Sequence, residues 1–279
     1  MITVEFDYKK ATTVEEALAA LANGDGKLLA GGYSLVPSMK LRLSQPEFLI
    51  DISSISSLKG IQEEDGFIVI RAGTTHAEIL NSALIQEKLP FFHTAAGVIG
   101  DVQVRNRGTI GGSLAHADPA ADWPALVLAA DAVIDVVSRN GSRSISATDF
   151  FTGLFSTALG ENELITAIRI PVPPAGTRTA YMKFEHPASR FAIVGCAVMR
   201  FPDGKINIAF TGVAEYAFRD KGAEQAVAGN TLDAASMDAA VNAALQGQDV
   251  SFMGDNFASE EYRRHLAKVY LKRALQAVA

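Results

Sequence analysis

The sequence has very little cysteine. Its 279 residues include a single one, Cys196. This excludes an internal disulfide, and it excludes an iron–sulfur cluster held by four thiolates of this chain. Cys196 lies in the apolar segment 193–199, which is typical of a buried strand. We therefore interpret it as a small buried hydrophobic residue, with a reactive thiol as the alternative.

Long apolar runs and an excess of positive charge are missing as well. No segment reaches the roughly 20 apolar residues that a membrane-spanning helix needs. The net charge is −6, and the sequence shows no basic stripe of the kind that binds nucleic acid. Residues 1–7 carry no basic region followed by an apolar one, so we expect no signal peptide and a cytoplasmic location.

The motifs of several enzyme classes are also absent from the sequence. There is no Gly-x-x-x-x-Gly-Lys-Ser/Thr phosphate loop and no Gly-x-Ser-x-Gly nucleophile elbow. The histidines are never three or four positions apart, so no metal-ligand spacing appears. We expect neither a metal site nor a catalytic side chain in this chain. Its chemistry would then depend on an organic cofactor that the protein binds and orients.

Two glycine pairs are the most informative feature that is present. The first lies in Ala30-Gly31-Gly32-Tyr33-Ser34 and the second in Thr109-Ile110-Gly111-Gly112-Ser113. A glycine pair allows positive φ and lets a ligand approach the backbone, and consecutive N–H groups in such turns bind anions. Neither pair has the Gly-x-Gly-x-x-Gly pattern of a dinucleotide-binding helix. We predict one extended ligand with a diphosphate, held on two separate turns rather than at one helix N-terminus.

Apolar periodicity and turn signals predict an α+β fold. The expected strands are 27–30, 48–52, 67–73, 132–137 and 164–170. Thr-x-x-Glu capping boxes predict helices that begin after Thr13 and Thr75, and Asn23-Gly24 should end the first of them. The second box places His76 in an exposed first turn, where a surface role and a site role are both open.

Further helices are expected on either side of the second glycine pair. The small residues of 94–100 favour a helix packed closely on a sheet. Asp118 is a candidate N-cap and Pro119 fits the first helical position, which would put Trp123 on the buried face of that helix.

The proline-rich segment 171–176 predicts a domain boundary. We expect an N-terminal domain over 1–173, divided into subdomains of about 1–53 and 54–173, and a C-terminal domain over 174–279. The C-terminal domain should contain three extended segments followed by helices. These are 179–184, 192–201 and 206–213, and then 217–228, 234–245 and 260–278.

The sequence around both glycine pairs resembles a known family. Leu29 to Arg42 is similar to the first FAD-binding segment of the medium, flavoprotein subunit of molybdenum hydroxylases, such as carbon monoxide dehydrogenase and xanthine dehydrogenase. The segments 103–122 and 163–171 resemble two further landmarks of that family. The resemblance spans the whole chain. It implies a two-subdomain FAD-binding domain of the PCMH/VAO type, followed by a smaller domain with a three-stranded antiparallel sheet and a helical bundle.

The resemblance also implies which residues bind FAD, without a covalent link. Both glycine segments would supply N–H groups and hydroxyls to the diphosphate. Asp122 would contact the ribityl region, while the remaining side chains would line the isoalloxazine ring and its surroundings. The cofactor-binding residues predicted in this way are Leu29, Ala30, Gly31, Gly32, Tyr33, Ser34, Leu35, Thr109, Ile110, Gly111, Gly112, Ser113, Asp122, Ile165, Lys183 and Phe191.

Several of these residues have a plainer interpretation. Asp122 could serve only the dipole of a helix N-terminus. Lys183 could face solvent and Phe191 could belong to the core. Arg105 and Arg107 could approach phosphates, lie at the surface or contact a partner.

By this resemblance the chain is an oxidoreductase subunit that carries FAD as an electron relay. A small partner subunit would hold [2Fe–2S] clusters and a large one the molybdenum cofactor, in a cytoplasmic heterotrimer. The external acceptor would be NAD, a quinone or oxygen. Two alternatives stay open: a stand-alone flavin oxidoreductase that uses NAD(P)H, and a non-redox FAD-binding module. Tyr33, Ser113 and Phe191 stand where the carbon monoxide enzymes carry His, Asp and Tyr, so the organic substrate is left open.

Overall fold

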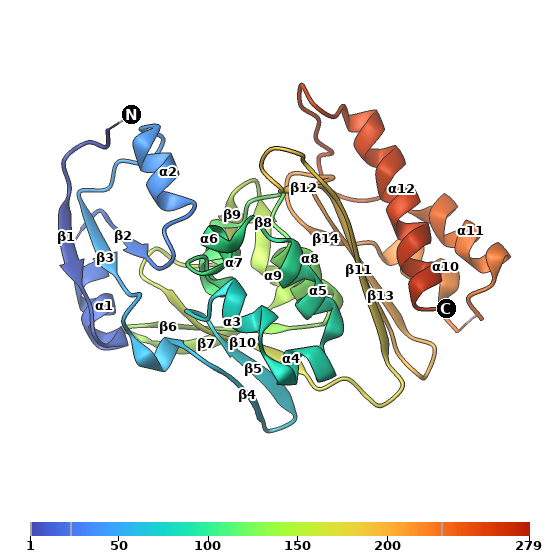
Figure 1. The fold of residues 1–279 in the computed structure, drawn as a ribbon, viewed down its shortest axis with the longest axis horizontal. Helices are drawn as coiled ribbons and strands as arrows, with labels where there is room; N and C mark the ends of the chain where they lie inside the picture. Colours follow the sequence, from blue (N-terminus) through green and yellow to red (C-terminus); the bar gives the residue numbers. More distant parts are fainter. Residues whose placement is uncertain (1, 23, 230) are drawn as a thin grey trace.

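Three main sheets follow one another along the chain in the computed structural model, which describes residues 2–22, 24–229 and 231–279 (Figure 1). The first sheet is parallel and has the order β1-β3-β2. Helix α1 packs on this sheet, and α2 follows β2. The bounds are β1 Asp7–Lys10, α1 Val14–Leu21, β2 Gly26–Leu29, α2 Leu35–Lys40 and β3 Phe48–Asp51.

The second sheet is antiparallel, with the order β4-β5-β10-β6-β7, and short helices lie against it (Figure 1). Its strands are β4 Ile61–Glu64, β5 Phe67–Arg71, β6 Val133–Ser138, β7 Gly141–Ser146 and β10 Leu164–Pro171, and a small hairpin is formed by β8 Phe151–Gly153 and β9 Ser156–Thr157. The helices are the 3₁₀ turn η1 Ser56–Leu58, α3 His76–Leu80, α4 Ala83–Lys88, α5 Pro90–Val98, α6 Val102–Arg105, α7 Ile110–His116, α8 Trp123–Ala129 and α9 Ala147–Phe150.

The third sheet is covered by helices on both faces. Its order is β11-β12-β13-β14, all antiparallel. Helices α5 and α8 contact one face, and α10 and α12 contact the other (Figure 1). The bounds are β11 Arg178–Glu185, β12 Ala192–Arg200, β13 Ile206–Thr211, β14 Phe218–Arg219, α10 Lys221–Val227, α11 Ala234–Ala243 and α12 Glu260–Ala277.

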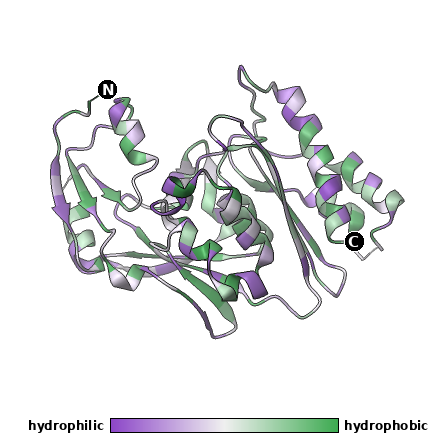
Figure 2. Cartoon of the chain, in the orientation of Figure 1, coloured by the Kyte–Doolittle hydropathy of each residue, from purple (hydrophilic) through white to green (hydrophobic). Residues whose placement is uncertain are grey.

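One hydrophobic core joins the second and third sheets. It is built around the fully buried rings of Phe91, Phe92 and Trp123, and it includes Tyr181 and Met199 from the third sheet. Separate clusters lie under α10 to α12 and within the first unit. Hydrophobic and hydrophilic residues alternate along the helices and strands, as Figure 2 shows, and the hydrophobic ones form these buried clusters. Cys196 is buried among them, and burial raises the pKa of its thiol, which confirms the interpretation as a small hydrophobic residue.

The structure differs from the sequence-based expectation in several elements. The third sheet has a fourth, short strand, β14, which lies within the helix predicted over 217–228, so that helix α10 begins only at Lys221. The helix expected to begin at Asp118 begins only at Trp123, because Asp118 uses its carboxylate to cap the N–H of Ala120 in a turn. The Thr13 hydroxyl does cap Glu16, but the Glu16 carboxylate bonds Thr12 instead, so the box is incomplete. The predicted end of α1 at Asn23 lies outside the described residues.

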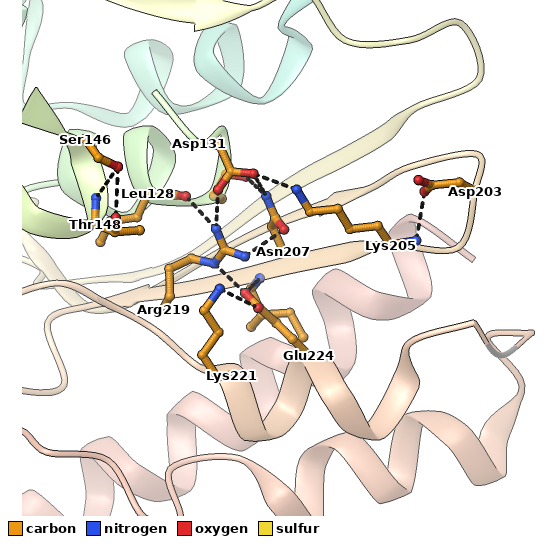
Figure 3. Close-up of polar contacts among 12 residues, drawn as sticks. Leu128, Asp131, Ser146, Thr148, Asp203, Lys205, Asn207, Arg219, Lys221 and Glu224 are labelled. Carbon is orange, nitrogen blue, oxygen red and sulfur yellow. Dashed lines mark hydrogen bonds and ion pairs between the residues drawn. The ribbon is translucent and has the colours of Figure 1, made fainter. Parts of the chain in front are cut away.

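A buried polar network fixes the third sheet to the end of α8 (Figure 3). Arg219 on β14 donates to Asp131 at 2.7 Å, to the Asn207 side chain at 2.6 Å and to the Leu128 carbonyl at 3.1 Å. It also pairs with Glu224 on α10. Since buried charges are stable only when paired and hydrogen-bonded, this network specifies how the two parts of the molecule meet.

Candidate functional site

A cleft of about 570 Å³ lies between the first sheet and the helices of the second. Its walls come from β2 and the start of α2, from α7 and the turn before α8, and from β10. A loop between β11 and β12 adds Ser189 to Phe191. The volume is in the range typical of pockets for organic ligands.

The first glycine pair presents unused hydrogen-bond donors to this cleft. Gly32 has a φ of +79°, a conformation that favours glycine. The N–H groups from Gly31 through Leu35 donate to no other described residue, and Ser34 precedes α2 without capping it. The Ser34 hydroxyl likewise has no partner among the described residues. Because such donors need a partner or water, these N–H groups are available to a ligand in the cleft.

The second glycine pair lies in the first turn of α7, and its N–H groups are already used. Ile110 donates to the Thr74 carbonyl at 3.1 Å and Gly111 to the Ala72 carbonyl at 2.9 Å. Gly112 donates to the Thr109 hydroxyl at 3.1 Å, and the Ser113 N–H bonds the Thr109 carbonyl at 3.0 Å. The expectation of a second turn with unpaired N–H groups is therefore wrong for 110–113, and a helix takes its place.

Close packing explains why glycines stand at Gly31 of the first pair and Gly111 of the second. A Cβ on Gly111 would lie 2.5 Å from the Ala72 Cβ. A Cβ on Gly31 would lie only 2.2 Å from the Arg107 carbonyl oxygen and 2.8 Å from the Gly108 Cα. The two glycine segments thus touch through their backbones, and any side chain at Gly31 would push them apart.

The cleft collects most of the residues that the sequence predicts to bind cofactor. All of them line it except Ile110 and Lys183. Ile110 is fully buried in the core. Phe191 and Tyr33 remain 44% and 42% exposed at the cleft, so the interpretation of Phe191 as a core residue is wrong.

Asp122 is a buried carboxylate in the cleft wall. The Tyr181 hydroxyl donates to it at 2.5 Å, and the Lys183 ammonium lies 2.9 Å from it. Burial raises the pKa of the Asp122 carboxyl, while Lys183 and the Tyr181 hydroxyl act in the opposite direction. Burial and the neighbouring Asp122 hold the pKa of Tyr181 well above its usual value. Lys183 is only 4% exposed, which excludes a position in solvent.

His76 is buried rather than exposed, against the expectation for the first turn of α3. The capping box at Thr75 is present as predicted, but the His76 ring packs on Trp123 and accepts a hydrogen bond from its indole N–H at 3.1 Å. Desolvation, with a smaller contribution from Arg105, lowers the pKa of His76 to about 4. Its Nε2 has no described hydrogen-bond partner, and the residue lines the cleft.

Three further observations on the described residues concern Arg105, metal binding and membrane spanning. Arg105 donates to the carbonyls of Ile99 and Gly100 at 3.0 and 3.1 Å, so it stabilises a turn at the cleft edge. No group of three or more His, Cys, Asp or Glu residues there is placed to hold a metal ion. None of the helices within that part of the chain is long and apolar enough to cross a membrane.

Comparison with known proteins supplies the family. Residues 4–173 match the family described as "FAD binding domain in molybdopterin dehydrogenase". Residues 179–278 match the "CO dehydrogenase flavoprotein C-terminal domain". The chain belongs to this family of flavoprotein subunits. It is thus an FAD-binding oxidoreductase subunit of the molybdenum hydroxylase type.

Individual members of the family resemble the chain over nearly all of its length. The carbon monoxide dehydrogenase medium chain of Hydrogenophaga pseudoflava is 41% identical over 99% of this chain and 98% of its own. The glyceraldehyde dehydrogenase medium chain of Sulfolobus acidocaldarius is 36% identical over 100% of both. A solved structure of the Hydrogenophaga carbon monoxide dehydrogenase, lacking the Mo-pyranopterin moiety of the molybdenum cofactor, matches with a TM-score of 0.95 at 42% identity, over 100% and 98%.

Sequence reasoning missed several residues of this flavoprotein cleft. Ala72 and Gly73 line it from the turn after β5, and Gly100, Ser189 and Arg190 line it from two loops. Gly73 and Gly100 were visible as isolated glycines. Nothing local in the sequence indicates that these turns meet, because they come from distant parts of the chain.

Proposed function

We propose that the cleft binds FAD and that this chain is the electron exit of a molybdenum–iron–sulfur–flavin dehydrogenase. The observation that carries the proposal is the run of unpaired N–H groups from Gly31 to Leu35, in a chain whose family binds FAD. Five consecutive donors of this kind suit the oxygens of a diphosphate. The cleft volume of about 570 Å³ and its bare glycine backbone also fit an extended dinucleotide.

The other cleft residues have distinct proposed roles. Thr109, Gly112 and Ser113 offer hydroxyls and unobstructed backbone on the opposite wall, next to the diphosphate. The Asp122 carboxylate accepts hydrogen bonds from hydroxyl groups of the cofactor. Ile165 and Phe191 supply apolar contact for its ring.

We also retain the domain division predicted from the sequence. The N-terminal domain, 1–173, would hold FAD between its subdomains, 1–53 and 54–173, and 174–279 would form the C-terminal domain. The separate family matches over 4–173 and 179–278 support this division. The course of the cleft between the first and second sheets supports the subdomain boundary.

The proposed redox role is that of a relay between partner subunits and an external acceptor. In this proposal the large subunit would hold the molybdenum cofactor, the small subunit would hold the [2Fe–2S] clusters, and the external acceptor would be NAD, a quinone or oxygen. FAD in the cleft would supply the exchange between one-electron and two-electron transfer. The residues of this chain bind it, orient it and exclude water from it.

Spectroscopy on the purified chain tests the FAD assignment. We expect the chain to bind FAD in a one-to-one ratio and the flavin absorption to bleach on addition of dithionite. Fast anaerobic bleaching by NADH without any partner would favour the stand-alone oxidoreductase. A bound flavin that dithionite cannot reduce would favour the non-redox module. Absence of FAD binding would overturn all three.

Purification of the tagged chain from its native cells tests the relay. The complex should contain iron and molybdenum together with FAD, on a small and a large partner chain. Addition of the organic substrate to that complex should then bleach the flavin. A complex with neither metal would contradict the relay.

A further inference from the structure

The carboxylate of Asp122 is held from the third sheet, although it forms part of the cleft wall beside the second. Asp122 stands at the N-cap of α8 but makes no side-chain cap bond there. The Tyr181 hydroxyl donates to its Oδ1 at 2.5 Å. The Lys183 ammonium lies 2.9 Å from each of its two oxygens. Both donors belong to β11.

The strand β11 and its neighbours hold the side chains of Tyr181 and Lys183 in place. Tyr181 and Lys183 are two positions apart on β11, so their side chains leave the same face of the sheet. Lys183 also donates to the Val98 carbonyl at the end of α5, at 3.1 Å. On β12, a Cβ at Gly195 would lie 2.5 Å from the Tyr181 hydroxyl oxygen. A glycine at this position therefore leaves the space that the tyrosine hydroxyl needs.

The charged groups around Asp122 determine whether its carboxyl is ionised and can accept hydrogen bonds from a ligand. A carboxylate this deeply buried would take up a proton if it were alone. Glu185, on the same strand, disfavours its ionised form further, and Lys183 and Tyr181 favour it. An ionised carboxylate has about four acceptor positions. Tyr181 and Lys183 occupy only part of these, which leaves acceptor capacity on the side that lines the cleft.

We propose that Tyr181 and Lys183 are positioning residues of the FAD site, which keep Asp122 ionised and oriented so that it accepts hydrogen bonds from the cofactor's hydroxyl groups. This inference rests on the proposed function. It assigns to the third sheet a part in cofactor binding, although neither residue lines the cleft. It also gives Lys183 an indirect role in place of the direct contact expected from the sequence.

FAD affinity measured against pH tests this role. In Lys183→Met, Asp122 loses its cation, so its pKa rises and FAD affinity at neutral pH should fall roughly tenfold or more. The affinity should recover as the pH is raised and Asp122 ionises. The double variant Lys183→Met/Asp122→Asn should bind weakly at every pH, because it has no carboxylate to titrate. Lys183→Arg should stay close to wild type across the range.

The controls separate this inference from a general loss of structure. Lys59→Met, which removes an exposed lysine without a described ion pair, should bind FAD like the wild type. If Lys183→Met does not fold, Tyr181→Phe tests the same cluster, and its effect on affinity should vanish when Asp122→Asn is already present.

Two results would overturn the inference. One is wild-type FAD affinity in Lys183→Met at all pH values. The other is a pH dependence that persists in the double variant, since Asp122 could not then be its source. Failure of the wild-type chain to bind FAD would instead overturn the proposed function, so the two failures are distinguishable.

Discussion

At the scale of the residue, the two glycine segments at the cleft differ in whether their backbone N–H groups have a hydrogen-bond partner within the protein. The N–H groups from Gly31 to Leu35 have no described partner, whereas those of Ile110 to Ser113 are bonded within the protein. Unpaired donors next to a cleft are where a ligand gains most, because it replaces only water. In the proposed function, the first glycine pair therefore has the larger share in binding the cofactor.

Gly32 can be tested against a glycine of the same conformation elsewhere. Gly32 and Gly66 both have a φ of +79°, a value that a β-branched residue adopts only with strain. Gly66→Val should therefore destabilise folding by about 1–2 kcal/mol through backbone strain. Gly32→Val should cost more than this, because its Cβ would also lie 3.2 Å from the Leu29 Cδ1 and 3.3 Å from the Val36 Cγ2. Only Gly32→Val should lose FAD, at least tenfold in affinity, as measured by flavin fluorescence titration. Equal FAD affinity in the two variants would contradict the role of the first segment.

His76 predicts how stability depends on pH. Its pKa is lowered to about 4 in the folded protein, whereas an unfolded histidine has a pKa of about 6.5. The unfolded state then binds more protons between these values, so the stabilisation present above pH 6.5 is lost as the pH falls toward 4. The loss attributable to this residue is roughly 3 kcal/mol.

Urea unfolding at several pH values, compared with His76→Gln, measures this effect. The variant should lose much of the acid sensitivity between pH 6.5 and 4, because an amide does not titrate while its oxygen can still accept from Trp123. An imidazole that NMR shows titrating near 6.5 in the folded protein would contradict the account.

At the scale of the element, local signals fixed most strands and several helices. β2, β3, β5, β6 and β10 lie where alternation and apolar runs predict them, and the Thr75 capping box opens α3 as expected. Asp118-Pro119 misleads because the same residues favour a turn: Ala117 ends α7 with a φ of +49° and Asp118 closes the next turn. The local sequence Asp118-Pro119 suits both a helix start and a turn, so it does not distinguish between them.

Distant contacts decided what local patterns could not. His76 is buried by Trp123, which comes from another helix. Gly111 is bonded and packed against Ala72, far away in the sequence. The sequence thus indicated which residues gather at the cleft, but it could not show which N–H groups would be free when they met.

The network around Arg219 makes β14 and α10 depend on the end of α8. Arg219→Met removes the buried cation that pairs with Glu224, and the Glu224 residue is only 8% exposed. We expect a loss of roughly 3–5 kcal/mol of stability in urea unfolding. Glu224→Gln should recover part of this loss in the double variant. Arg139→Met, at an exposed hairpin turn, is the matched control and should change stability little; equal effects in both would contradict the role of the network.

At the scale of the whole molecule, the proposed cofactor site depends on all three sheets. The first contributes the free donors, the second the packed wall, and the third holds Asp122 through Tyr181 and Lys183. The resemblance of the two glycine segments to flavoprotein subunits gave the family and the fold class from the sequence. The sequence does not identify the organic substrate, because relatives of similar identity are named for different substrates, carbon monoxide and glyceraldehyde.

Amide hydrogen exchange with and without FAD is the most direct test of the central claim. The account predicts that the amides from Gly31 to Leu35 exchange fast in the free chain and become strongly protected when FAD is bound. Ile110 to Ser113 should already be protected without it, because their N–H groups are bonded internally. Fast exchange at Gly31 to Leu35 in the presence of saturating, demonstrably bound FAD would contradict it.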